Sequence, residues 1–205
     1  VQSVGITAPT TSAIDAVDIE TYMNEQEALG RYTAIVYPIS FLLSIGVLWL
    51  YVRLRGGKRA IHINHSASGF NPSVVLVGVL WLLSAQIILE PLILLLPQSA
   101  TPSVGLGAWA IVTAVVSAPI LEEILCRGLL FGAFNKRWSI AVSILLSALL
   151  FGILHADLGS MIVATVAGLI FGVLYVRTSS IFATMIVHSI NNAMALTLVN
   201  FEKDR

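Results

Sequence analysis

The stretch "WAIVTAVVSAPILEEILCRG", residues 109–128, decides the fold class of this chain. It begins as an apolar run of the kind that crosses a bilayer. It ends with two adjacent carboxylates, Glu122 and Glu123, and with the guanidinium of Arg127. Ionisable groups at membrane depth are costly, and they are rare unless they have a function. The stretch therefore predicts both a membrane helix and a functional site within it.

The composition of the whole chain supports a membrane protein. Of its 205 residues, 57% are hydrophobic and 11% are charged, whereas soluble domains carry about 25% charged residues. The mean hydropathy is +0.91. The net charge is zero, which gives no electrostatic case for binding nucleic acid. The single cysteine, Cys126, excludes an intramolecular disulfide.

Six apolar stretches of 17 to 31 residues predict six transmembrane helices. A polar segment over residues 1–32 precedes them, and the membrane domain is expected over 33–205. The predicted fold class is all-α, a polytopic membrane helical bundle. The predicted spans are 33–52, 73–97, 104–134, 138–156, 160–176 and 181–200.

The basic residues predict the orientation, because Lys and Arg favour the cytoplasmic side of a membrane. If six spans alternate in direction, three basic residues fall on one side: Arg31, Lys203 and Arg205. The others all fall on the opposite side. The chain is therefore expected to be an integral, multi-pass membrane protein with both termini on the non-cytoplasmic side. The residues on the cytoplasmic side are Arg53, Arg55, Lys58, Arg59, Arg127, Lys136, Arg137 and Arg177.

Four polar side chains from three predicted spans are candidates for one buried site: Glu122, His155, His188 and Asn192. At a helical rise of ~1.5 Å per residue, Glu122 and Asn192 each lie about 18 Å from the cytoplasmic ends of their spans. His188 lies about 10–12 Å deep and His155 about 26 Å. Any one of them alone is more readily explained as a hydrogen bond between helices, worth roughly 1 kcal/mol. Their similar depth predicts a shared polar cavity.

Spacing along the helices divides these polar groups further. Glu123 and Arg127 are four residues apart, the spacing of an ion pair, so Arg127 is expected to neutralise Glu123. Glu122 is rotated by about 100° from Glu123 and is left to face the cavity. A carboxylate, two imidazoles and an amide can bind a divalent metal ion. Alternatively, a carboxylate and a histidine can deprotonate water while the other two groups bind an oxyanion.

Three short motifs resemble those of a known family. "EEILCR" (122–127) is similar to its E-E-x-x-x-R motif, "FGILH" (151–155) to F-x-x-x-H, and "HSINN" (188–192) to H-x-x-x-N. In this order and on three predicted helices, they resemble the CPBP family (CAAX protease and bacteriocin-processing, or Abi) of intramembrane proteases. The resemblance covers roughly residues 104–200, the expected protease-like core.

The resemblance implies an intramembrane endopeptidase that acts on a peptide or protein substrate in the lipid bilayer. Glu122 and His155 would activate water, and His188 and Asn192 would bind the oxyanion. Glu123 and Arg127 would give structural support. A mechanism without a cofactor is preferred, because the His188–Asn192 pair suits an oxyanion site. Zinc, held by Glu122, His155 and His188, is the alternative.

Other interpretations compete with the enzyme. The main alternative is a pseudoenzyme: a non-catalytic scaffold, immunity factor or accessory subunit of a larger membrane protein complex. Cys126 is interpreted as a packing residue rather than as the nucleophile of a thiol protease. Asp157 is expected to cap the loop that follows His155 rather than to orient its imidazole. Gln86 and Glu90 are expected to belong to a kinked helix, because Pro91 follows them.

Overall fold

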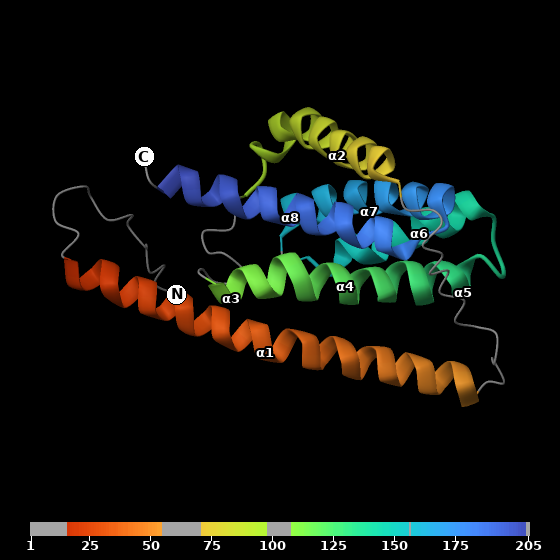
Figure 1. Ribbon diagram of the computed structural model, residues 1–205, viewed down its shortest axis with the longest axis horizontal. Helices are drawn as coiled ribbons and strands as arrows, with labels where there is room; N and C mark the ends of the chain where they lie inside the picture. Colours follow the sequence, from red (N-terminus) through yellow and green to blue (C-terminus); the bar gives the residue numbers. More distant parts are fainter. Residues whose placement is uncertain (1–15, 55–70, 98–107, 156, 204–205) are drawn as a thin grey trace, which may run out of the picture.

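The computed structural model of the protein describes residues 16–54, 71–97, 108–155 and 157–203. Within these ranges every element is helical, which confirms the all-α membrane bundle (Figure 1). Five elements are long helices; the third predicted span is divided among several shorter ones. The long helices are α1 (Ala16–Leu54), α2 (Pro72–Ile93), α6 (Ile140–Ile153), α7 (Leu158–Thr178) and α8 (Ile181–Lys203).

The third predicted span is a helical run over residues 108–134 that passes from α-helix to π-helix and back two times. Two π-helical stretches flank the short α-helix that carries the paired carboxylates, and such stretches often occur at functional sites. The sequence pattern predicted the span but not the change in winding. The run consists of α3 (Ala108–Ile111), η2 (Val112–Ser117), α4 (Ala118–Glu123), η3 (Ile124–Phe131) and α5 (Gly132–Phe134).

Three of the described helices are long and apolar enough to cross a membrane: Thr21–Tyr51 within α1, then α2 and α7. The apolar helices Ile140–Ile153 and Ile181–Thr197 are shorter. Helix α1 already begins at Ala16, so it runs through the boundary expected between residues 32 and 33. Part of the basic segment used for the orientation, with Arg55, Lys58 and Arg59, lies outside the described residues.

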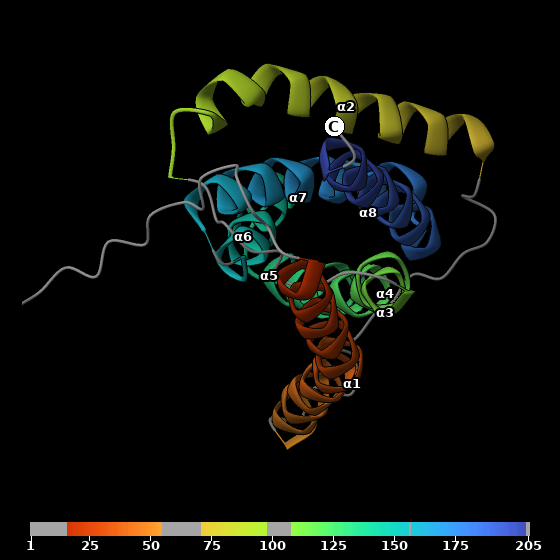
Figure 2. The same cartoon turned by 90° about the vertical axis from the view of Figure 1, so that its left-hand side faces the viewer.

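The helices form layers around α7 and α8. Helix α1 lies along α3, η2 and α4, while α2 covers α7 and α8 on the other side (Figures 1 and 2). Helix α1 begins and α8 ends at the same end of the bundle (Figure 1). The apolar side chains of α1 are largely exposed, as expected for a helix that faces lipid.

Helices α6 and α7 make the closest contact in the bundle, and glycines permit it. A Cβ atom at Gly168 would lie 3.0 Å from the Cα atom of Ala148. A Cβ atom at Gly152 would lie 2.0 Å from Thr165 Oγ1 and 2.7 Å from the carbonyl oxygen of Met161. Small residues let membrane helices approach closely, which gains dispersion energy where lipid provides no hydrophobic drive.

The turn between α6 and α7 is fixed by Asp157, the N-cap of α7. Its carboxylate accepts a hydrogen bond from the backbone N–H of Ser160 at 2.9 Å and from the Ser160 hydroxyl at 2.7 Å. These two bonds lower the pKa of the Asp157 carboxyl, the backbone bond most strongly. The expected capping role of Asp157 is confirmed.

Candidate active site

Helix α4 and the start of η3 carry a buried ion pair. Arg127 Nη1 donates to Glu123 Oε1 at 3.1 Å, and neither side chain is exposed. Arg127 Nη2 donates to the carbonyl oxygen of Gly168 in α7 at 2.7 Å. We refer to Glu123, Arg127 and the Gly168 carbonyl as the charge cluster. The ion pair expected from the four-residue spacing is confirmed, and it also connects η3 to α7.

His188 of α8 lies between the two carboxylates. Its Nδ1 lies 3.1 Å from Glu123 Oε1, and its Nε2 lies 3.7 Å from Glu122 Oε2. The imidazole stacks on Phe171 with 4.7 Å between ring centroids, and it meets the edge of Phe151 at 5.7 Å. The two carboxylates and the two aromatic rings together fix the position of the imidazole within the bundle.

Glu122 is almost fully buried and has a different set of neighbours from Glu123. The hydroxyl of Tyr37, from α1, donates a hydrogen bond to Glu122 Oε1. Arg127 forms its ion pair with Glu123 and not with Glu122. Glu122 is therefore stabilised by a phenol and an imidazole, whereas Glu123 has a guanidinium beside it.

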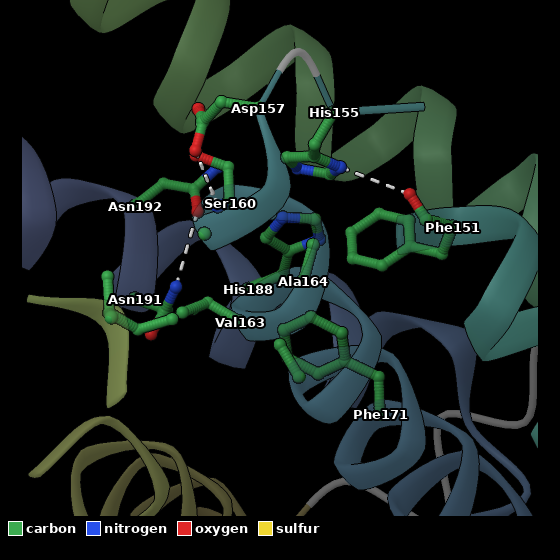
Figure 3. A pocket seen from close by; sticks show the side chains of 13 residues that line it. Phe151, His155, Asp157, Ser160, Val163, Ala164, Phe171, His188, Asn191 and Asn192 are labelled. Carbon is green, nitrogen blue, oxygen red and sulfur yellow. Dashed lines mark hydrogen bonds between the residues drawn. The ribbon is translucent and has the colours of Figure 1, made fainter. Parts of the chain in front are cut away.

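A cavity of about 360 Å³ opens beside this site, between the α6–α7 turn, α7 and α8. His155, His188 and Asn192 all line it, and Figure 3 shows both imidazoles on its wall. Phe151 and Phe171 supply apolar surface. Polar and apolar groups contribute about equally to its surface, and its size is within the range of binding sites for small ligands.

His155 follows the C-terminus of α6 and is only partly buried. Its Nδ1 lies 3.1 Å from the carbonyl oxygen of Phe151, and the Phe151 ring meets the imidazole edge-on at 5.2 Å. If Nδ1 carries the hydrogen and donates to this carbonyl, Nε2 is free to accept a proton. His155 forms no hydrogen bond or ion pair with Glu122 in the described structure.

Asn192 belongs to a second polar chain, which links α2, α8 and η2. Gln86 Nε2 donates to Asn191 Oδ1 at 2.6 Å, and Asn191 Nδ2 donates to Asn192 Oδ1 at 3.4 Å. Asn192 Nδ2 donates to the carbonyl oxygen of Ala114 in η2 at 2.8 Å. An amide nitrogen carries two hydrogens, so Asn192 keeps one N–H for a ligand in the cavity.

The structure thus brings three of the four predicted residues to one cavity and places the fourth behind them. Glu122 does not line the cavity, and it approaches the site through His188. The donor set considered for zinc does not form a metal site: among the described residues, no three His, Cys, Asp or Glu side chains are grouped to hold a metal ion. The side chains present therefore do not fit a zinc ion.

Several contacts at the site were not predicted. Tyr37 lies in the first span, outside all three motifs, and 85 positions from Glu122. Phe171 contacts His188 from α7, in a stretch that reads as ordinary membrane helix. No local pattern marks either residue. A polar ring on a lipid-facing helix was the one available signal for Tyr37, since such rings favour the membrane interfaces.

The remaining polar candidates have structural places. Cys126 is fully buried in an apolar cluster with Phe151 and Phe171, as expected for a packing residue. Gln86 is hydrogen-bonded, as expected. Glu90 is exposed and does not line the cavity, and α2 continues past Pro91 to Ile93.

The fold and site together define a helical membrane protein with a buried polar centre beside a cavity. Residues 104–194 match the family model described as Type II CAAX prenyl endopeptidase Rce1-like. The resemblance to the CPBP family is thereby confirmed, and all three motifs lie within the matched residues. The match supports a CAAX-protease-like function in general. No curated protein and no solved structure matches the chain.

Proposed function

We propose that the chain is an intramembrane endopeptidase in which Glu122 is the general base. One observation carries the proposal. Glu122 is a buried carboxylate without a guanidinium partner, and it lies behind His188, which lines a cavity together with His155 and Asn192. A carboxylate with such spare capacity can accept a proton, whereas Glu123 is held by Arg127.

The proposed reaction is a direct hydrolysis. A water molecule that reaches Glu122 from the cavity gives it a proton, assisted by His155, and the water oxygen attacks the carbonyl carbon of the scissile peptide bond. The resulting oxyanion receives hydrogen bonds from Asn192 Nδ2–H and from His188. The proton then passes to the leaving nitrogen as the carbon–nitrogen bond breaks, which restores the Glu122 carboxylate. No metal ion enters this sequence of steps.

The proposed substrate is a peptide segment at the membrane, and a prenylated CAAX peptide is the first to test. The family description names prenyl endopeptidases of that class. The cavity offers aromatic and aliphatic surface from Phe151, Phe171 and Val163 next to its polar groups. Such a lining can bury the apolar side chains of a substrate while the polar groups face the peptide bond.

The test is hydrolysis by the purified chain in lipid, followed by mass spectrometry of the products. Glu122→Gln keeps the shape of the side chain and removes the proton acceptor. The expected loss of turnover is about 10²-fold or more, with substrate binding retained, because a general base acts in the transition state. Full activity in Glu122→Gln would refute the proposed base.

A non-catalytic scaffold is the second candidate, and one observation favours it. The polar contacts join α1, α4, α7, α8 and η3 into one unit, which a scaffold also requires. A scaffold would bind its partner protein equally well with Glu122 or with Gln at this position, and neither form would cleave a peptide. An enzyme would show the difference in turnover described above.

A further inference from the structure

Tyr37 is the polar contact of α1 with the centre of the bundle. Its ring stacks on Phe41 of the same helix, with centroids 4.7 Å apart, and its hydroxyl donates to Glu122 Oε1. Helix α1 otherwise presents mainly exposed apolar side chains. This hydrogen bond therefore joins a lipid-facing helix directly to the residue that we propose as the general base.

The hydroxyl of Tyr37 occupies one of the two oxygens of Glu122. The other oxygen, Oε2, is the one that faces His188 Nε2. Among the described residues, Tyr37 is the only hydrogen-bond donor to Glu122. A buried carboxylate needs hydrogen-bond donors to offset its desolvation, and Arg127 serves Glu123 instead. Tyr37 thus fixes the orientation of Glu122.

Tyr37 also lies outside the residues that match the protease family, 104–194. The matched segment contains all of the motif residues, but it contains no part of α1. The site as seen in the structure is therefore larger than the segment that defines the family. One component of it comes from a helix that the three motifs do not include.

We infer that Tyr37 is a positioning residue, which acts through Glu122 by orienting one carboxylate oxygen toward His188 and the cavity. This inference rests on the proposed function of Glu122. It makes α1 a required part of the active site and not only a membrane anchor.

Tyr37→Phe tests the inference, because it removes the hydroxyl and keeps the ring that stacks on Phe41. The matched control is Tyr32→Phe on the same helix, where the side chain is 62% exposed. Tyr37→Phe should lower kcat/KM by about 10-fold to 100-fold, the effect of one hydrogen bond to a charged group. Tyr32→Phe should leave kcat/KM unchanged.

The split between kcat and KM separates positioning from a general loss of structure. Glu122 is proposed to act in the transition state, so Tyr37→Phe should lower kcat of the folded molecules and leave KM unchanged. The groups around Glu122 are Tyr37 of α1, His188 of α8, and Glu123, Cys126 and Arg127 on its own helical run. All except Tyr37 are unchanged in the variant.

A second measurement does not depend on activity. Infrared difference spectroscopy can follow the carboxyl and carboxylate bands of Glu122, identified by their loss in Glu122→Gln. These bands should shift in Tyr37→Phe, which removes the hydrogen bond to Glu122, and stay in place in Tyr32→Phe. Unshifted bands, or an unchanged kcat, would overturn the role of Tyr37. Shifted bands in a chain that cleaves no peptide would support the contact while refuting the proposed enzyme.

Discussion

Glu122 and Glu123 are neighbours in the chain, yet they belong to two different regions of the molecule. Glu123 lies in the charge cluster, where a guanidinium and an imidazole share its Oε1. Glu122 lies on the other side of His188, between that imidazole and the phenol of Tyr37. One helical step of about 100° is enough to separate the two environments.

This difference shows how a membrane protein can use one buried charge to stabilise its structure and keep another for chemistry. The charge cluster binds its members to fixed partners on η3, α7 and α8, so each charge is neutralised where it stands. On the cavity side, hydrogen-bonding capacity remains: Asn192 and His155 line the cavity, and the bond to Ala114 uses only one of the two N–H groups of the Asn192 amide. The predictions below test this division, from the largest expected effect to the smallest.

The charge cluster should be the most sensitive region for stability. Arg127→Ala leaves the buried carboxylate of Glu123 without its cation, and breaking a buried pair in this way costs about 3–5 kcal/mol. We expect a much lower yield of folded protein in detergent and a lower thermal midpoint. Arg137→Ala is the control, because Arg137 is exposed. A stable, fully active Arg127→Ala protein would contradict the structural role of the cluster.

The contact between α6 and α7 should be the next most sensitive. Gly152→Ala adds a Cβ atom 2.7 Å from the Met161 carbonyl oxygen, so the two helices must separate. Overpacking of this kind costs about 1–3 kcal/mol. Thermal unfolding measures the loss. Gly46→Ala on α1 is the matched control, since its Cβ atom would meet nothing within 4 Å. Equal midpoints for the two variants would show that the close approach is not required.

The hydrogen bonds through Asn191 should contribute less to stability than the contact between α6 and α7. Gln86→Leu removes the donor to Asn191 Oδ1, and hydrogen bonds between membrane helices average about 0.6 kcal/mol. We expect a small loss of stability and a loss of activity of a few fold, because Asn191 in turn donates to Asn192. Ser84→Ala serves as the control, since the Ser84 hydroxyl donates to a carbonyl within α2. An activity equal to that of the wild type would show that the function of Asn192 does not depend on the hydrogen bonds through Asn191.

The cap of α7 should give the smallest effect, and one that depends on pH. Hydrogen bonds from Ser160 lower the pKa of Asp157 in the folded state. The contribution of the ionised Asp157 cap to folding stability is therefore present above the pKa of the unfolded state, about 3.9. It is lost as the pH falls through the pKa of the folded state. Asp157→Ala should cost about 1 kcal/mol near neutral pH. The difference in thermal midpoint should shrink between pH 7 and pH 3, and a constant difference would exclude the ionised cap.

Local features of the sequence predicted much of the fold. Apolar length predicted the helices, because a bilayer requires about 20 apolar residues in each span. The four-residue spacing predicted the pair of Glu123 and Arg127, since both side chains lie on one face of a helix. The three motifs predicted the family that residues 104–194 match.

Contacts between distant helices were beyond the sequence. The spacing along one helix indicated that Glu122 faces away from Glu123, but not that His188 contacts both carboxylates. Tyr37 comes from a helix with no motif, and its contact depends on how α1 packs against α4. The π-helical winding on both sides of α4 also depends on packing, because apolar periodicity has no signal for it.

The most direct test compares Glu122→Gln with Glu123→Gln in one experiment, measuring thermal stability and turnover per folded molecule. We predict that Glu122→Gln keeps the thermal midpoint and loses about 10²-fold or more in turnover. Glu123→Gln should lower the midpoint clearly, because it leaves Arg127 buried without its counter-ion. The molecules that remain folded should retain most of their turnover. The opposite pattern, with Glu123→Gln folded but inactive and Glu122→Gln active, would contradict the division of roles between the two carboxylates.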